Sequence, residues 1–152
     1  MADTYLAPDD DTRALARRLT GAPDGALATV LDGRPLATRV GCAWGGAVGM
    51  TLLVSDLSDH ARALRQIPAA SLLLGAPGGR GDALTQPRLT LRGPVVELDK
   101  AAWRDRFLAA RPKSTLYYDF ADFRLMALQI DEALLNAGFG RAVRLTAADL
   151  GT

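Results

Sequence analysis

The chain has 152 residues, of which 49% are hydrophobic and 23% charged, and these values are typical of one ordinary globular domain. Its formal net charge of +1 excludes a strong overall field that would attract nucleic acid or an anionic membrane. Cys42 is the one cysteine, which excludes an internal disulfide and a zinc site built from several cysteines.

We expect a single domain over residues 1–152, with a core from about residue 10 to residue 145. The acidic N-terminus lacks the apolar core of a targeting signal, and no apolar stretch approaches the length of a membrane span. These features predict a cytoplasmic protein that acts on a small molecule, without a nucleic-acid or membrane partner.

The first part of the sequence predicts a helix followed by an antiparallel meander. Three aspartates precede an amphipathic stretch at residues 10–19, and acidic residues at a helix start interact favourably with its dipole. Asp32-Gly33 and Gly45-Gly46 are hairpin turn signals. They separate three predicted strands, at residues 26–31, 35–44 and 47–54.

A second helix and a fourth strand follow the meander. Ser58 is a favourable N-cap for a helix that continues to Gln66, and Pro68 ends it. Residues 69–75 predict a strand that is too apolar to be exposed on either face. Residues 76–87 are rich in glycine and proline and predict a loop.

The last third combines strands and helices. Alternating side chains at residues 88–98 predict a long strand, with a bulge at Gly93-Pro94. Asp99 caps a predicted helix at 100–110, and Pro112 begins a second helical segment. The remaining elements are a strand at 123–130, a brief strand at 132–136 and a short C-terminal helix. Many antiparallel strands with few helices predict a mainly β or α+β domain, a small barrel with peripheral helices.

The sequence contains no pattern that favours a catalytic nucleophile or a metal site. His60 is the one histidine, and no serine lies in a Gly-x-Ser-x-Gly elbow, so the pattern does not favour a catalytic triad. Cys42 lies in mid-strand without a flanking signature, and we expect a buried, inert thiol there. A transition-metal site would need one histidine and scattered carboxylates, so we predict no metal site and name no catalytic residue.

Residues 55–60 form the most informative polar segment. A helix N-terminus offers N–H groups and a positive dipole end, and two serines and His60 add side-chain donors. An anion site is one interpretation of this combination, and plain N-capping, which would need only Ser58, is the other. Asp56 and Asp59 would oppose an anion if their carboxylates turned inward.

A resemblance to a known family rests on four blocks in a fixed order: Pro35–Val40, Met50–Leu64, Pro68–Leu74 and Pro87–Gly93. Their order and spacing resemble the FMN-binding split barrel of the pyridoxamine 5'-phosphate oxidase-like superfamily, over about residues 10–145. Two further blocks, Asp119–Leu125 and Asn136–Ala142, are similar to the haem-utilisation, HugZ-like branch of that superfamily.

The resemblance implies an antiparallel six-stranded split β-barrel and a homodimer, with flavin (FMN) in clefts where two barrels meet. Ser58 and His60 would lie near the flavin phosphate, and Arg88 would approach the edge of the flavin ring. The full set of cofactor-binding residues that the resemblance implies is Thr38, Arg39, Val40, Leu53, Val54, Ser55, Ser58, His60 and Arg88.

The sequence departs from the family pattern at its phosphate-binding positions. Oxidases of the family usually have an arginine at the position of Thr38 and an Arg-Lys pair at Asp59-His60, so strong charge-assisted phosphate contacts are missing. The substrate motif of the vitamin oxidase has no counterpart, and pyridoxamine phosphate oxidation is not expected. Haem-degrading members use a C-terminal histidine, and residues 144–152 contain none.

The main prediction is therefore an FMN-binding protein, a flavin-dependent oxidoreductase of unknown substrate. One alternative is a dimeric, non-enzymatic binding module that has lost flavin. The other is a haem-binding or haem-utilisation protein that uses His60 or a non-histidine ligand.

Overall fold

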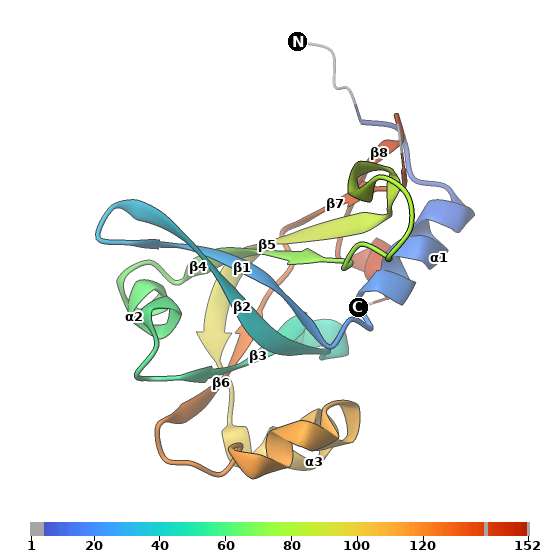
Figure 1. The fold of residues 1–152 in the computed structure, drawn as a ribbon. Helices are drawn as coiled ribbons and strands as arrows, with labels where there is room; N and C mark the ends of the chain where they lie inside the picture. Colours follow the sequence, from blue (N-terminus) through green and yellow to red (C-terminus); the bar gives the residue numbers. More distant parts are fainter. Residues whose placement is uncertain (1–4, 139, 152) are drawn as a thin grey trace.

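Six strands close into an antiparallel barrel in the computed structural model, which describes residues 5–138 and 140–151 (Figure 1). These strands are β1 (Asp24–Leu31), β2 (Arg34–Trp44), β3 (Met50–Ser55), β4 (Ala69–Leu74), β5 (Arg88–Glu97) and β6 (Phe123–Leu128). They pair in the order β4-β1-β2-β3-β6-β5, and a β4–β5 pairing closes the ring. The predicted fold class, a six-stranded antiparallel split barrel with peripheral helices, is confirmed.

The sheet continues beyond the barrel because β5 exchanges partners along its length. Residues 88–92 pair with β7 (Glu132–Asn136), whereas Val95 to Glu97 pair with β6. β8 (Ala142–Leu145) pairs with the outer edge of β7. The exchange takes place at Gly93-Pro94, where the Gln129 N–H donates to the Pro94 carbonyl at 2.9 Å.

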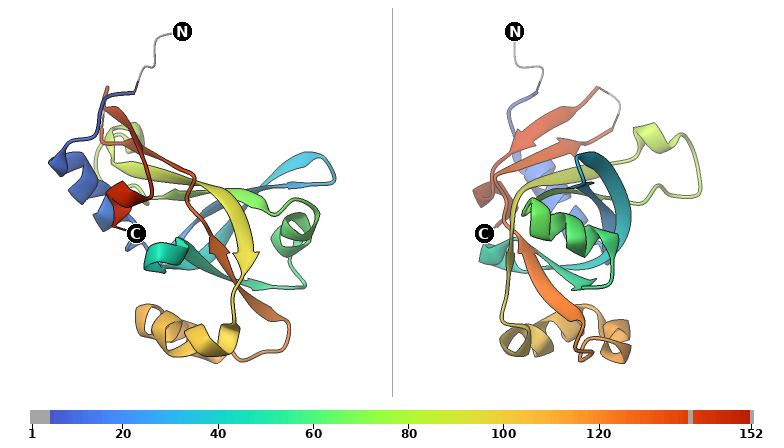
Figure 2. Two further views of the ribbon diagram at one scale, coloured as in Figure 1. Left: turned by 180° about the vertical axis from the view of Figure 1, so that it is seen from behind. Right: turned by 90° about the vertical axis from the view of Figure 1, so that its left-hand side faces the viewer.

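Three α-helices lie at the periphery of the barrel (Figure 2): α1 (Asp10–Leu19), α2 (Asp59–Gln66) and α3 (Lys100–Ala110). The side chains of Asp9, Ser58 and Asp99 accept hydrogen bonds from first-turn amides, as the sequence predicted for the second and third helices. In the part of the chain that the structure describes, no helix has the length and hydrophobicity needed to cross a bilayer.

Within the described residues, four short 3-10 helices complete the fold. Two of them matter here, because Tyr117, the residue after η3, lines the candidate site and η4 contacts α1. They are η1 (Gly46–Val48), η2 (Ala83–Thr85), η3 (Pro112–Leu116) and η4 (Ala148–Leu150).

Apolar side chains form two separate clusters, because successive residues of a strand point to opposite faces. The larger cluster fills the barrel and includes Leu27, Leu52, Leu72 and Leu91, all fully buried. The smaller one lies outside the barrel wall, where α3 and the segment after it cover β3 and β6. Its buried members are Ala43, Leu53, Phe107, Tyr118 and Leu125.

The structure corrects three expectations about single elements. The third strand begins at Met50 rather than residue 47, because η1 precedes it and Gly49 adopts a φ of 86°. The fourth strand is not buried on both faces, since Leu73 points outward from the barrel and is 43% exposed. The C-terminal helix is only the 3-10 helix η4.

Candidate functional site

A shallow pocket of about 310 Å³ lies on the outer face of β2 and β3, between the start of α2 and the end of η3. Alternation along β2 places Arg39 and Gly41 on the outer face, whereas Val40 between them is buried. Most of the residues expected to bind a cofactor therefore meet in one place. The lining residues are Arg39, Val40, Gly41, Leu53, Ser55, Ser58, His60, Tyr117 and Phe123.

His60 is half-buried on the pocket wall, and Thr38 of β2 orients its ring. The His60 Nδ1 lies 3.1 Å from the Thr38 Oγ1, a hydrogen-bond distance, so Nε2 is the nitrogen left to meet a ligand. Burial lowers the pKa of His60 below 6.5, and the Asp59 carboxylate opposes this shift. The ring is therefore neutral at neutral pH, the form in which histidine binds metal ions.

The two serines of the segment build its turn rather than point freely into the pocket. The Ser58 Oγ accepts from the Ala61 N–H at 3.2 Å and donates to the Ser55 carbonyl at 2.6 Å. The Ser55 Oγ donates to the Asp122 Oδ2 at 2.6 Å. N-capping thus accounts for Ser58, and the first-turn amides of α2 are what the helix end offers an anion.

The neighbouring aspartates are engaged with arginines. Asp56 forms ion pairs with Arg65 at 3.1 Å and with Arg124 at 2.9 Å. Asp59 forms one with Arg62 at 2.8 Å. Their carboxylates are therefore compensated, which lessens the repulsion that the sequence raised against an anion.

Arg111, which follows α3, is a second cation at the pocket edge. A Cβ built on Gly41 would lie 2.8 Å from the Arg111 Nη2, so the guanidinium occupies the space beside that glycine. The Arg111 Nε donates to the Ser114 Oγ at 3.4 Å, and the Ser114 Oγ lies 3.2 Å from the Tyr117 hydroxyl. Sequence reasoning missed Arg111, whose only signal is its position at the end of a predicted helix.

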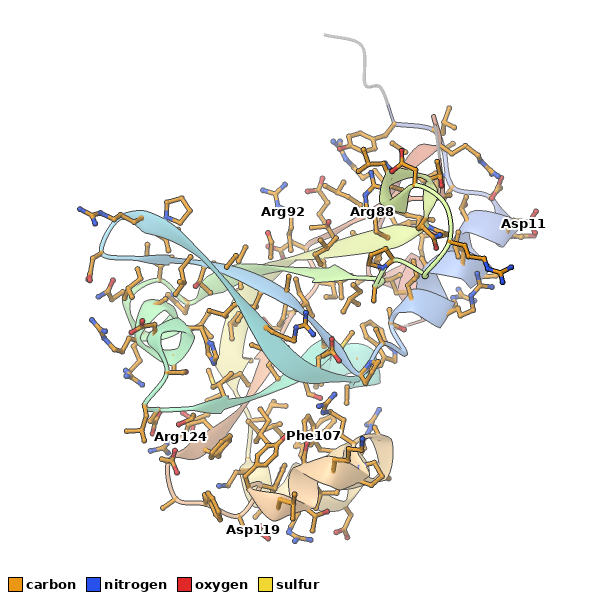
Figure 3. All side chains as sticks on the ribbon, in the orientation of Figure 1. Asp11, Arg88, Arg92, Phe107, Asp119 and Arg124 are labelled. Carbon is orange, nitrogen blue, oxygen red and sulfur yellow. The ribbon has the colours of Figure 1, made fainter. Side chains whose placement is uncertain are left out.

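Two residues of the expected set lie away from this pocket. Val54 is 2% exposed and lines a different hollow with Asp56 and Arg124. Arg88 lies near β7, where its Nη1 donates to the Leu84 carbonyl at 3.0 Å. Figure 3 shows Arg88 far from Arg124, at opposite ends of the molecule. A single chain therefore does not bring all nine expected residues together.

Aromatic side chains form the far wall of the pocket. Tyr117 and Phe123 stack with ring centroids 5.2 Å apart, and both contact the outer cluster. The sequence analysis placed these residues in a helical segment and a strand without assigning them to the site. Tyr117 and Phe123 come together through the fold of the segment between η3 and β6, and no local sequence pattern predicts that fold.

Cys42 is the buried thiol that the sequence predicted. It is 1% exposed, and its Sγ donates to the Ala22 carbonyl at 3.4 Å. Burial raises the pKa of Cys42 to about 12, so the reactive thiolate is absent at neutral pH. Cys42 is therefore a core residue.

A closed antiparallel barrel with a polar pocket beside a helix start defines a split-barrel protein. No protein-family model matches the chain. Among curated proteins, it is 34% identical to "Non-canonical heme oxygenase HOZ, chloroplastic" of Arabidopsis thaliana over 131 residues, which are 82% of this chain and 38% of the relative. The chain thus spans less than half the length of this relative.

Solved structures with the same fold include a "heme binding protein from Mycobacterium smegmatis", 29% identical, with a TM-score of 0.81. That likeness covers 97% of this chain and 62% of the other. A Clostridium acetobutylicum protein assigned to the pyridoxinephosphate oxidase family shares the fold at 12% identity, with a TM-score of 0.71 over 94% of this chain and 99% of its own. The chain therefore shares the split-barrel fold of these proteins, and two of the proteins that it is similar to, the plant relative and the mycobacterial structure, are named for haem.

Proposed function

We propose that the chain binds haem in the pocket on the outer face of β2 and β3, where His60 would hold the iron. The observation that carries this proposal is the 3.1 Å contact between the His60 Nδ1 and the Thr38 Oγ1. With Nδ1 protonated, the ring donates to the hydroxyl, and Nε2 keeps the lone pair that a metal needs. Proteins orient metal-binding histidines in this way, through a hydrogen bond to the other ring nitrogen.

The donor set fits haem better than it fits a protein-only metal site. Haem iron needs one or two axial ligands from the protein, because the porphyrin supplies the other four. His60 is neutral and lines the pocket, whereas Cys42 is buried and protonated. Bound haem would supply an iron centre that binds oxygen or transfers electrons.

The relatives support the same ligand class. The names of the plant relative and of the mycobacterial structure both refer to haem, at 34% and 29% identity. Because the chain spans only 38% of the plant protein, haem binding is proposed here and haem degradation is not.

A second copy of the chain would complete the pocket. Its volume of about 310 Å³ is at the lower end for ligand sites, which span about 300–1,000 Å³. Beside it, the outer faces of β1, β2 and β4 expose Ala26, Ala37 and Leu73, an apolar surface that a partner barrel could cover. We therefore propose that the protein acts as a homodimer.

FMN is the second candidate ligand, because the first turn of α2 adjoins the pocket. Backbone amides at a helix N-terminus bind phosphate, and Arg39 on the neighbouring strand would add a positive charge. A flavin-dependent oxidoreductase is the function that this ligand would support.

Titration of the purified protein with haemin, and separately with FMN, tests the proposal. We expect the Soret band of haemin to shift and sharpen in a saturable way as protein is added. His60→Ala should weaken haemin binding by roughly tenfold or more and change the ligand-field spectrum. Arg18→Ala, an exposed change on α1 away from the pocket, is the control and should bind like the wild type.

Two results would overturn the assignment. Haemin binding of unchanged affinity and spectrum in His60→Ala would remove His60 as the ligand. Saturable FMN binding, together with a haemin Soret band that the wild type leaves unchanged, would reject haem in favour of the flavin candidate.

A further inference from the structure

Arg111 faces the backbone of β2 at close range. A Cβ on Gly41 would lie 2.8 Å from the Arg111 Nη2, 2.9 Å from Cζ and 3.0 Å from Nε. Three nearly equal distances mean that the face of the guanidinium, not its edge, covers this glycine. Gly41 is thus the residue that lets the arginine lie against the strand.

The Arg111 side chain is anchored at one end only. Its Nε donates to the Ser114 Oγ at 3.4 Å, and Ser114 is 1% exposed and adjoins the Tyr117 hydroxyl. This contact fixes the Nε side of the guanidinium, so the two Nη atoms remain as donors. Two parallel N–H groups of this kind match the two oxygens of a carboxylate.

Arg39 presents a second guanidinium to the same pocket. It points outward from β2 like Gly41, two residues earlier, and strand geometry separates the two positions by about 7 Å. The two cations therefore reach one face of β2 at separate points. One compact anion would engage one of them more readily than both.

Neither arginine has an acidic partner within residues 5–138 and 140–151. Three acids near the pocket are engaged elsewhere: Asp56 and Asp59 with other arginines, and Asp122 with the Ser55 hydroxyl. Asp24 lies opposite Gly41 in the β1–β2 ladder but forms no ion pair with either arginine. Two cations without an ion-pair partner beside a partly apolar pocket favour an anionic ligand. Their separation favours a ligand with two anionic groups.

We propose that Arg39 and Arg111 form a two-point clamp for the two propionate carboxylates of a porphyrin, each arginine binding one carboxylate. This inference rests on the proposed haem binding and identifies what would select haem over FMN, which has one phosphate. His60, Arg39 and Gly41 line the same pocket, and the Arg111 guanidinium covers Gly41. A ligand in this pocket could therefore meet the imidazole and both cations.

Comparison of haemin with haemin dimethyl ester tests the clamp, because the ester keeps the iron and loses both carboxylate charges. In the wild type, we expect the ester to bind more weakly than haemin. Arg39→Ala and Arg111→Ala should each weaken haemin binding by roughly tenfold and leave binding of the ester nearly unchanged. Arg18→Ala, which removes a charge from exposed α1, is the matched control and should match the wild type for both ligands.

Two further variants separate a clamp from a packing effect. Arg111→Lys keeps the charge but not the paired donors, so haemin affinity should lie between those of the wild type and Arg111→Ala. Gly41→Ala displaces the guanidinium without removing it, and should also weaken haemin more than the ester. If Arg111→Ala does not fold, Arg111→Lys and Gly41→Ala still test the clamp.

The outcomes distinguish this inference from the function on which it rests. A Soret band with wild-type haemin affinity in both arginine-to-alanine variants would overturn the clamp and leave haem binding intact. Equal losses for haemin and its ester in Arg111→Ala would also overturn it, because the arginine would then act only through packing. A wild type that leaves the haemin Soret band unchanged would overturn haem binding and the clamp together.

Discussion

Burial and one hydrogen bond decide the state of His60, the residue on which the haem proposal depends. The ring nitrogen bound to Thr38 is fixed, and burial favours the neutral form. Because the shift opposes protonation, the same burial makes the folded protein sensitive to acid. Ligand binding and stability are therefore linked through one imidazole.

The direction of this sensitivity can be predicted. The His60 pKa lies below 6.5 in the folded chain and near 6.5 in the unfolded chain, so the unfolded state takes up the proton first as pH falls. The His60 contribution should be fully present above pH 6.5 and decrease as the pH falls from 6.5 toward the lowered folded-state pKa. Urea unfolding at several pH values measures it.

A histidine variant isolates this contribution from other titrating groups. His60→Gln should show a smaller loss of unfolding free energy between pH 7.5 and 5 than the wild type. The difference should be well below about 1.4 kcal/mol per pH unit, since the ring is only half-buried and is screened by solvent. Equal slopes in the two proteins would contradict the prediction.

Some site residues could be predicted from sequence, and others could not. Ser58 and His60 follow a capping pattern, so their position at a helix start was predictable, and family spacing added Arg39. Arg111 was not predictable, because the direction of a long side chain depends on the glycine that it meets across the fold. Arg88 was placed with the site by resemblance, yet it lies near β7 in this chain.

At the scale of elements, Gly93 is where β5 passes from its β7 partner to its β6 partner. A Cβ there would collide with the Gln129 carbonyl oxygen, because the connection from β6 to β7 crosses β5 at this point. The Asp131 N–H donates to the Arg92 carbonyl at 2.9 Å, which holds the crossing closed. The barrel therefore requires a residue without a side chain here.

Gly93→Ala should destabilise the fold by about 2–3 kcal/mol, as expected for overpacking against rigid backbone. Thermal unfolding followed by circular dichroism measures the change. Gly79→Ala is the control, since no atom lies within 4 Å of a Cβ there, and its melting temperature should stay close to that of the wild type. A Gly93→Ala protein as stable as this control would mean that the crossing can relax.

Element positions were predictable where short-range chemistry fixes them. Capping residues located α2 and α3, and turn glycines separated β1 from β2. The apolar composition of β4 predicted a strand buried on both faces, and this was wrong because Leu73 lies on the outer face of the barrel. An apolar strand is buried on both faces only if something covers each of them, and a single sequence does not say what that is.

At the scale of the whole molecule, the exposed outer face of β1, β2 and β4 predicts self-association. Ala26 pairs with Arg39 on one side and with Leu73 on the other, so these side chains form one continuous row. Light scattering after size-exclusion chromatography should give a dimer for the wild type. Leu73→Arg should shift it to a monomer, because the row already contains Arg39 and a second arginine would add a like charge to the surface that the partner covers.

Leu84→Arg supplies the control for this prediction. Leu84 is 66% exposed and belongs to η2, away from the row, so its substitution should leave the dimer intact. A wild type that is monomeric at concentrations well above those used for ligand titration would contradict the dimer. A dimer that persists in Leu73→Arg would place the interface elsewhere.

The two ends of the described chain are held together on one side of the barrel. The Leu6 N–H donates to the Ala142 carbonyl at 2.9 Å, and the Arg13 Nε donates to the Asp149 carboxylate at 2.7 Å. Figure 1 shows α1 and β8 on this side and α2 on the opposite side. A short peptide linker could therefore join Leu6 to Leu150, so that a circularly permuted barrel opened in the 76–87 loop keeps the same strand order. A fluorescent reporter fused to either end would likewise extend away from α2.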